Sequence, residues 1–507
     1  MSADKKVRVR FAPSPTGGLH LGGVRTVLFN YLFAKSNNGD FILRIEDTDQ
    51  SRFVPGAEEY ISSCLAWCGL VPDESPQTGG PYGPYRQSER KARYQEFAER
   101  LIANGYAYYA FDTPEELDKL RQLTPNFRYS HENRDQLRNS LNLDEAAVKA
   151  LLENGTPYVI RIKMPVDETV SLNDMIRGHV SFETSSVDDK VLLKADGMPT
   201  YHLAVVVDDY QMKITHAFRG EEWLPSAPVH LLLWEYLGWK TDMPQWAHFP
   251  LILKPDGNGK LSKRDGDRLG FPVYAMNWQD PKSGDLTKGF KELGFLPEAF
   301  INMLALLGWN DGTDQELFSL DELIQKFSID RISKSGAKFD FEKAKWFNHE
   351  WIKREDANKL IPSIQHILTS HGVVVDDDNY LRLIFDLVKD RLTFLPDFWE
   401  QASFFFVEPE NYDLDAIQKK WSDEKTTFFN NIIPALAAFE PWHTEEIEHF
   451  YKLAIQSSGL KLGELMLPFR IMLVGGKFGP HVFDIAKLLG REKTIARMKK
   501  GLAAILS

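Results

Sequence analysis

The sequence contains only two cysteines among its 507 residues, Cys64 and Cys68. They lie four residues apart in SSCLAWCGL without nearby histidines, so they cannot provide the four ligands of a structural zinc site. A pair of cysteines on one buried helical face is typical of core thiols in a reducing compartment. We therefore expect no structural metal.

Long apolar runs are also missing from the chain. No run approaches the roughly 20 residues that are needed to span a bilayer. The opening residues, MSADKKVRVR, show neither the apolar region of a signal peptide nor the composition of a transit peptide, and they lead into a predicted strand. These absences predict a cytoplasmic protein with no membrane partner.

Positive charge is in deficit, because the net charge at pH 7 is −12. Net acidity argues against nucleic-acid binding, which depends on neutralising phosphates, but the distribution of charge matters more than the sum. Residues 487–500 include six basic side chains and one acid, and residues 331–354 include seven basic and three acidic side chains. Solvated helix faces would look the same, so an RNA partner stays open.

The spacing of apolar residues divides the chain into two parts. The first part alternates a strand at VRVRFA, a helix at GGVRTVLFNYLFAKSN and a strand at DFILRIED, which predicts a βαβ unit. A polar, helical stretch at 113–154 resembles an insertion, and further strands are predicted at VLLKADGMPTYHLAVVVDD and QMKITHAFRG. After about Asn310 the spacing is helical. We therefore predict an α/β half followed by a helical half.

The segment PSPTGGLHLGG joins the first predicted strand to the first predicted helix. Its glycines, Gly17, Gly18, Gly22 and Gly23, allow a ligand to approach the main chain closely. The free N–H groups at the start of a helix attract phosphate, and His20 adds a donor there. A plain turn between a strand and a helix would have a similar composition.

The loop KLSKR, residues 260–264, is the second candidate phosphate site. Lys260 and Lys263 could close over a triphosphate and stabilise the charge on a departing pyrophosphate. A solvated basic loop is the alternative interpretation.

The order and spacing of these two motifs resemble the signature pair of class I aminoacyl-tRNA synthetases. The segments RFAPSPTGGLHLGGVRTVLFNYLFA, RIEDTDQSR, YHLAVVVDDYQMKITHAFRGEEWL and LPFRIMLVGGKFGPHVFDIAKLLG resemble glutamyl-tRNA synthetases of the bacterial type. This resemblance implies a Rossmann-type α/β catalytic domain with an inserted acceptor-binding domain and an all-α C-terminal anticodon-binding half. It implies a catalytic domain at 1–110 and 188–255, an insertion at 111–187, a stem-contact region with the KLSKR loop at 256–330, and an anticodon-binding region at 331–507.

The resemblance further implies a glutamate–tRNA ligase that uses ATP and Mg²⁺. It would activate L-glutamate only with tRNA bound, transfer it to the 3′ end of tRNA(Glu), and act as a monomer. The implied catalytic residues are His20, Lys260 and Lys263. The implied ATP-binding residues are Gly17, Gly18, His20, Gly22, Gly23, Glu222 and Lys263. The implied glutamate-binding residues are Arg10, Ser14, Glu46, Tyr201, Val205 and Arg219, with Asp208 and Asp209 expected to organise the site.

These residue types suit a substrate with two carboxylates and one ammonium. Guanidinium groups such as those of Arg10 and Arg219 bind carboxylates in a forked geometry, and the carboxylate of Glu46 suits an ammonium. In the helical half, Arg391 is a candidate reader of an anticodon base, although a structural ion pair is equally consistent with it.

The sequence departs from the family pattern at three places. Gly23 stands where the HIGH-type signature usually has a histidine, and Val205 stands where a polar residue is familiar. The stretch AYYAFDTPEEL lacks the cysteines that form a zinc knot in many relatives, so we predict no zinc.

Four alternatives make different demands on the sequence. A glutaminyl relative would end in β-barrels, and a truncated relative that modifies a tRNA base would lack the helical half. A nucleotidylyltransferase would be far shorter. A non-catalytic RNA-binding descendant would have lost His20, Lys263 or Arg219. Whether glutamine tRNA is also charged stays open.

Overall fold

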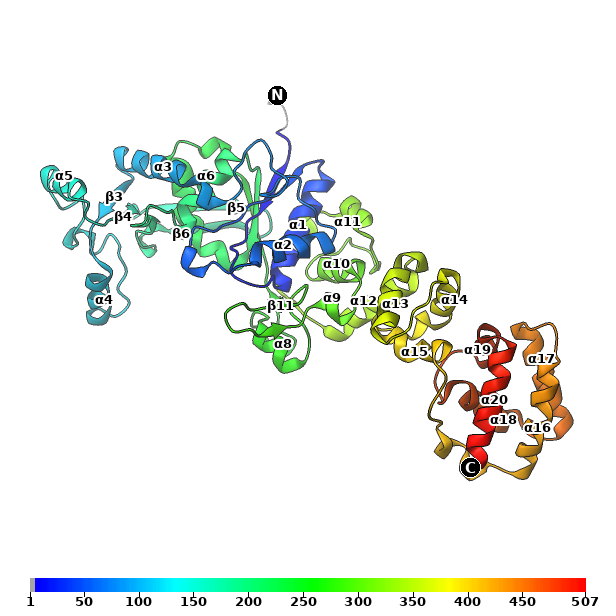
Figure 1. Ribbon diagram of the computed structural model, residues 1–507. Coiled ribbons are helices and arrows are strands. Elements are labelled where there is room, and N and C mark those ends of the chain that lie inside the picture. Colours follow the sequence, from blue (N-terminus) through cyan, green and yellow to red (C-terminus); the bar gives the residue numbers. More distant parts are fainter. Residues whose placement is uncertain (1–4) are drawn as a thin grey trace. The chain divides into compact units, whose positions relative to one another are not determined.

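The computed structural model describes residues 5–507, and these residues form two compact units (Figure 1). The first unit comprises Met1–Glu292 and Pro297–Phe341, and the second comprises Leu293–Leu296 and Glu342–Ser507. The finer division of the chain into four regions stays a prediction.

A six-stranded sheet lies at the centre of the first unit, in the order β2-β1-β8-β9-β5-β6. All neighbouring strands are parallel except β5 and β6, which pair in the antiparallel direction. The strands are β1 (Arg8–Phe11), β2 (Asp40–Leu43), β5 (Thr169–Asp174), β6 (Gly178–Glu183), β8 (His216–Gly220) and β9 (Gln245–Phe249). Because parallel strands end at one edge, that edge is where a ligand would bind.

Helix α1 (Leu21–Ser36) connects β1 to β2 and confirms the predicted βαβ unit. The other helices of this region are α2 (Ala57–Trp67), α3 (Lys91–Ala103) and α7 (Ala227–Tyr236). Cys64 and Cys68, at the end of α2, are free thiols and are buried, as predicted.

The prediction of a strand at YHLAVVVDD was wrong, because this segment begins α6 (Tyr201–Gln211). Every residue from Leu203 to Asp209 is buried. A helix that is surrounded by protein has no polar face, and its valine-rich run therefore has the composition of a buried strand. As a result, Asp208 and Asp209 lie inside the unit rather than in a surface turn.

A smaller sheet contains β3 (Ala107–Ala110), β4 (Val159–Ile162) and β7 (Val191–Leu193). The stretch between β3 and β4, predicted to be helical, contains two helices, α4 (Pro114–Leu123) and α5 (Glu145–Glu153), joined by a long irregular segment. The buried carboxylate of Asp189 accepts hydrogen bonds from Tyr108 at 2.7 Å and Arg134 at 3.0 Å, which ties this region together.

The remainder of the first unit consists of short elements. They are β10 (Ile252–Leu253), α8 (Lys263–Leu269), β11 (Trp278–Gln279), β12 (Leu286–Thr287), α9 (Phe290–Leu293), α10 (Pro297–Leu306), α11 (Leu320–Lys326) and β13 (Ala337–Lys338).

The second unit is helical, which confirms the prediction for the C-terminal half. Its helices are α12 (Phe341–Arg354), α13 (Ala357–Ser370), α14 (Asp378–Val388), α15 (Asp397–Phe406), α16 (Asp423–Ala437), α17 (Thr444–Ser458), α18 (Leu462–Val474), α19 (Val482–Leu489) and α20 (Arg491–Leu506). Aromatic rings fill its core, where the ring centroids of Tyr451 and Phe469 lie 4.7 Å apart. Over the residues that the structure describes, no helix is both long and apolar enough to span a bilayer.

Candidate active site

A cavity of about 890 Å³ opens at the carboxyl end of β1 and β8 in the first unit. Its walls come from the loop after β1, the start of α1, the start of α6 and the KLSKR loop. The predicted residues that line it are Arg10, Ser14, His20, Gly22, Gly23, Glu46, Tyr201, Arg219, Glu222 and Lys260. The two signature motifs therefore meet at one cavity.

Five predicted site residues do not line this cavity. Gly17 has φ +149°, and a Cβ on Gly18 would lie 2.8 Å from the ring of Tyr274, so chain geometry and packing account for both glycines. The other three are Val205, buried in the core, Lys263, the first residue of α8, and Arg391, which belongs to the second unit. The roles expected of these five residues stay predictions.

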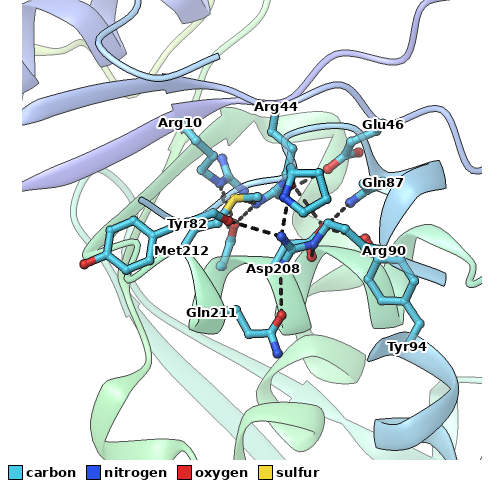
Figure 2. Close-up of polar contacts among 12 residues, drawn as sticks. Arg10, Arg44, Glu46, Tyr82, Gln87, Arg90, Tyr94, Asp208, Gln211 and Met212 are labelled. Atoms are coloured by element: carbon cyan, nitrogen blue, oxygen red, sulfur yellow. Dashed lines mark hydrogen bonds and ion pairs between the residues drawn. The ribbon is translucent and has the colours of Figure 1, made fainter. Parts of the chain in front are cut away.

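A buried network of arginines and carboxylates lies behind the cavity, and Figure 2 shows Arg44 and Arg90 next to Asp208, with Arg10 close to Arg44. Asp209 binds Nε of Arg10 at 3.0 Å and Nη1 of Arg44 at 2.8 Å. Asp208 binds Nε of Arg90 at 2.6 Å. Buried charges are tolerated only when they are paired and hydrogen-bonded, so the two aspartates fix the arginines in place. Their expected role in organising the site stays a prediction.

The network also sets the ionisation of its members. Burial would lower the pKa of Arg44, but Asp209, Asp208 and Glu46 outweigh it and raise that pKa above its ordinary value. Burial would raise the pKa of Asp209, but Arg10 and Arg44 hold it below its ordinary value. For Glu46 burial prevails, and its pKa is raised despite Arg44, whose Nη2 lies 3.2 Å from a Glu46 oxygen.

Arg219 differs from Arg10, which lines the same cavity and binds Asp209. Its side chain is buried, and Nη1 donates to Nδ1 of His230 at 3.0 Å. Its Nε has no hydrogen-bond partner among the described residues. No carboxylate of a described residue lies within ion-pair distance of its guanidinium. Burial lowers the pKa of Arg219, although Tyr201 opposes the shift.

The charges of the site therefore do not balance. The positive members are Arg10, Arg44, Arg90 and Arg219, and the negative members are Asp208, Asp209 and Glu46. Within this set Arg219 has no acidic partner, and its charge favours an anionic ligand. Arg25, which also lines the cavity, donates to backbone carbonyls instead of a carboxylate.

His20 caps α1, because its Nδ1 accepts a hydrogen bond from the backbone N–H of Gly22 at 3.2 Å. Burial, assisted by the charge of Lys260, lowers the pKa of His20 to about 4, so the ring is neutral near pH 7. Since Nδ1 accepts, the proton is on Nε2, which has no partner among the described residues. His20 therefore presents an unused N–H donor at the start of a helix.

Lys260, predicted to serve the phosphates, and Glu222, predicted to contact ATP, bind each other in this structure. Their side chains are half-exposed, and Nζ of Lys260 lies 2.6 Å from a Glu222 oxygen. An exposed ion pair contributes only about 0–1 kcal/mol, so a triphosphate can compete for the lysine. This pair could not be predicted from the sequence, because 38 residues separate its members.

Sequence reasoning missed two buried residues near the cavity, Arg25 and His230. Arg25 lines the cavity and donates to the backbone carbonyls of Leu307, at 2.8 Å, and Pro250. Burial lowers the pKa of Arg25 to about 10. His230 sits in APVHLLLWEY, where the apolar run predicts a core helix and nothing marks the histidine as a partner of Arg219.

Comparison with known protein families fits this geometry. A model of the class I tRNA synthetase catalytic domain for glutamate and glutamine (E and Q) matches residues 6–346, and a model of an anticodon-binding domain matches residues 355–502. The chain belongs to the class I tRNA synthetases. The α/β catalytic part and the helical anticodon part of this synthetase agree with the predicted fold class.

Individual relatives match the synthetase along its whole length. It is 51% identical to a glutamate–tRNA ligase of Porphyromonas gingivalis, over 98% of each chain. It is 52% identical to one of Flavobacterium psychrophilum, over 99% of this chain and 100% of that one. The crystal structure of a glutamate tRNA ligase from Elizabethkingia meningosepticum in complex with its amino acid is 50% identical, with a TM-score of 0.94, and covers 99% of this chain and 100% of that chain.

Within residues 5–507 no group of three or more histidine, cysteine, aspartate or glutamate side chains is placed to hold a metal ion. The lack of zinc stays a prediction from the sequence.

Proposed function

We propose that this synthetase is a glutamate–tRNA ligase, which activates L-glutamate with ATP and transfers it to the 3′ end of tRNA(Glu). The observation that carries the choice of amino acid is the unbalanced positive charge of Arg219. Glutamate has two carboxylates and one ammonium, so its net charge is −1, whereas the net charge of glutamine is zero. The names of the full-length relatives support the same choice.

The cavity wall offers a partner for each charged group of glutamate. Arg219 would bind the side-chain carboxylate, because it has no acidic partner and its Nε has no hydrogen-bond partner among the described residues. Glu46 would bind the ammonium, with Arg10 and Ser14 near the α-carboxylate and Tyr201 packed against the methylene groups. Charged hydrogen bonds of this kind are roughly twice as strong as neutral ones.

The chemistry needs no protein nucleophile. An oxygen of the glutamate α-carboxylate attacks the α-phosphorus of ATP, and pyrophosphate leaves with the electrons of the broken P–O bond. The Nε2–H of His20 and the free N–H groups at the start of α1 would donate to the phosphates. Lys260 would break its ion pair with Glu222 and bind the departing pyrophosphate. Mg²⁺ would enter with ATP as part of the nucleotide substrate.

The second half-reaction transfers the glutamyl group to RNA. A terminal ribose hydroxyl of the tRNA attacks the carbonyl carbon of the adenylate, and AMP leaves. The helical unit would hold the tRNA, with Arg391 as a candidate anticodon reader, and activation would require bound tRNA. We further propose that the enzyme acts as a monomer in the cytoplasm, where tRNA is charged.

ATP–pyrophosphate exchange tests this function. The enzyme should exchange label with glutamate and tRNA(Glu) present, exchange little without tRNA, and reject glutamine by about 10⁴-fold in kcat/KM. Replacing Arg219 by leucine should abolish exchange, whereas replacing exposed Arg268 by leucine should not. A lack of exchange with glutamate and tRNA present would overturn the proposal. Charging of purified glutamate and glutamine tRNAs then establishes which tRNAs are accepted.

A further inference from the structure

A pair of histidines next to Arg219 has no part in the reaction described so far. His230 lies on α7 with no exposed surface, and His202 lies in the first turn of α6. Nδ1 of His230 is 3.0 Å from Nη1 of Arg219, and Nε2 of the same ring is 3.2 Å from Nδ1 of His202. The three side chains therefore form one hydrogen-bonded chain.

The directions of these hydrogen bonds follow from the groups involved. A guanidinium only donates, so Nδ1 of His230 must be the unprotonated, accepting nitrogen. A neutral ring then carries its proton on Nε2, which donates to Nδ1 of His202. Burial, together with the charge of Arg219, lowers the pKa of His230 well below its usual value, and burial lowers the pKa of His202 to about 4. Both rings are therefore neutral near pH 7.

Packing fixes the accepting ring in place. The ring centroid of His230 lies 5.2 Å from that of Tyr201 and 6.2 Å from that of Trp246. Trp246 also lies against the guanidinium of Arg219, whose central carbon is 5.2 Å from the ring centroid. Arg219 is thus held by an imidazole and an indole, both neutral.

Arg10, on the neighbouring strand β1, shows the alternative arrangement. Its Nε binds Asp209, so its charge is matched within the protein. A carboxylate at position 230 would hold Arg219 equally well but would also neutralise it. The neutral imidazole orients the guanidinium and leaves its charge for a ligand.

We infer that His230 is a positioning residue that sets the specificity of this synthetase for an anionic amino-acid side chain. It fixes the plane of Arg219 without cancelling its charge, and His202 fixes the tautomer of His230. The inference rests on the proposed function, since it assigns the side-chain carboxylate of glutamate to Arg219. Its consequence is that glutamate binding and discrimination against glutamine depend on the hydrogen-bonding character of residue 230.

Three substitutions at one position separate this role from simple packing. His230→Leu removes the acceptor, His230→Asn keeps an accepting oxygen near the place of Nδ1, and His230→Glu adds a negative charge. Each is assayed by tRNA-dependent ATP–pyrophosphate exchange, with KM for glutamate, KM for ATP and kcat determined separately, and with glutamine as the competing substrate.

His230→Leu should raise KM for glutamate by about 10- to 100-fold, the usual effect of losing a hydrogen bond to a charged group. KM for ATP and kcat should stay within about 3-fold, because Arg219 acts in binding rather than in the chemical step. His230→Asn should recover most of the lost affinity. His230→Glu should raise KM further and reduce the preference for glutamate over glutamine by at least about 10-fold.

His216→Leu is the matched control, because His216 lies on β8 with Arg219 but packs against Phe33 and Phe218. It should leave KM for glutamate near that of the parent enzyme. Equal increases in KM for His230→Leu and His230→Asn would overturn the inference in favour of a packing role, as would an unchanged amino-acid preference in His230→Glu. If the parent enzyme itself fails to use glutamate, the proposed function fails, which is a different result.

Discussion

The two units of this synthetase bury their polar side chains in different ways. In the catalytic unit, most buried charges bind one another, as Arg44 and Arg90 bind Asp209 and Asp208. In the helical unit, the buried polar side chains among the described residues are Asn348, Lys425, Thr494 and Arg497. All four donate to backbone carbonyls within that unit.

The difference teaches what buried charge is used for. Replacing a buried ion pair by apolar groups is often neutral or stabilising, so stability alone does not account for the network of the catalytic unit. Arg10 and Arg219 line a cavity, and the partner of each one decides whether its charge is available to a ligand. The core of the helical unit has no comparable network of paired charges among the described residues. Aromatic rings pack there, as Tyr451 and Phe469 illustrate.

The largest effect should come from breaking the ion network. Asp208→Asn removes the charge that Arg90 needs, and it also disturbs the hydrogen bonds from Gln87 and Tyr94. We expect a loss of about 3–5 kcal/mol in the free energy of unfolding of the catalytic unit. Thermal melting measures this loss.

Glu408→Gln is the matched control for that experiment. Its carboxylate binds Lys500 at 2.9 Å on the exposed surface of the helical unit, so the loss should be about 0–1 kcal/mol. Similar melting curves for Asp208→Asn and Glu408→Gln would remove the distinction between the two units.

Acid should destabilise the catalytic unit before its carboxylates are titrated. The folded chain lowers the pKa of His202 and of His216 to about 4, in both cases because of burial, from an ordinary value of 6.5. Between these values the unfolded chain binds more protons than the folded chain, so stability falls as the pH falls. Melting temperatures measured from pH 6.5 down to pH 5 should therefore decrease, and His216→Leu should make that decrease shallower. A slope that His216→Leu leaves unchanged would contradict the assignment.

The smallest effect should come from a pair of buried tyrosines, one in each unit. The hydroxyl of Tyr94 donates to Asp208 at 2.8 Å, whereas that of Tyr451 lies 3.5 Å from the carbonyl of Leu465. Tyr94→Phe should cost about 1–3 kcal/mol and Tyr451→Phe less than about 1 kcal/mol, because only the first removes a hydrogen bond to a charged group. Urea unfolding followed by circular dichroism measures both. An equal cost at both positions would argue that hydrogen bonds to charge have no special weight here.

Local patterns predicted much of this fold. The βαβ unit and the helical C-terminal half have clear periodicity, and both are present. The start of α6 was misread because a helix buried on all sides lacks the alternation that distinguishes it from a strand. In a segment that is uniformly apolar, the residue pattern does not distinguish a helix from a strand.

The candidate site could be predicted only in part. The residues of PSPTGGLHLGG and KLSKR carry recognisable chemistry, and most of them line the cavity. The pairings of Lys260 with Glu222 and of Arg219 with His230 depend on tertiary contacts between separate elements. Whether a basic side chain is free or neutralised is a property of such contacts, and it cannot be read from residue type.

The order of strands in the central sheet also constrains how this chain can be synthesised. Strand β1 pairs with β2, 32 residues later, and on its other side with β8, about 200 residues later, where the N–H of Thr215 donates to the carbonyl of Arg8. During translation, one edge of β1 therefore has no partner until most of the catalytic unit has been made. The ion pair between Arg10 and Asp209 likewise cannot form until then. An unpaired strand edge invites association with other chains. The central sheet can therefore be completed only late in synthesis, because pairing across about 200 residues must wait for β8.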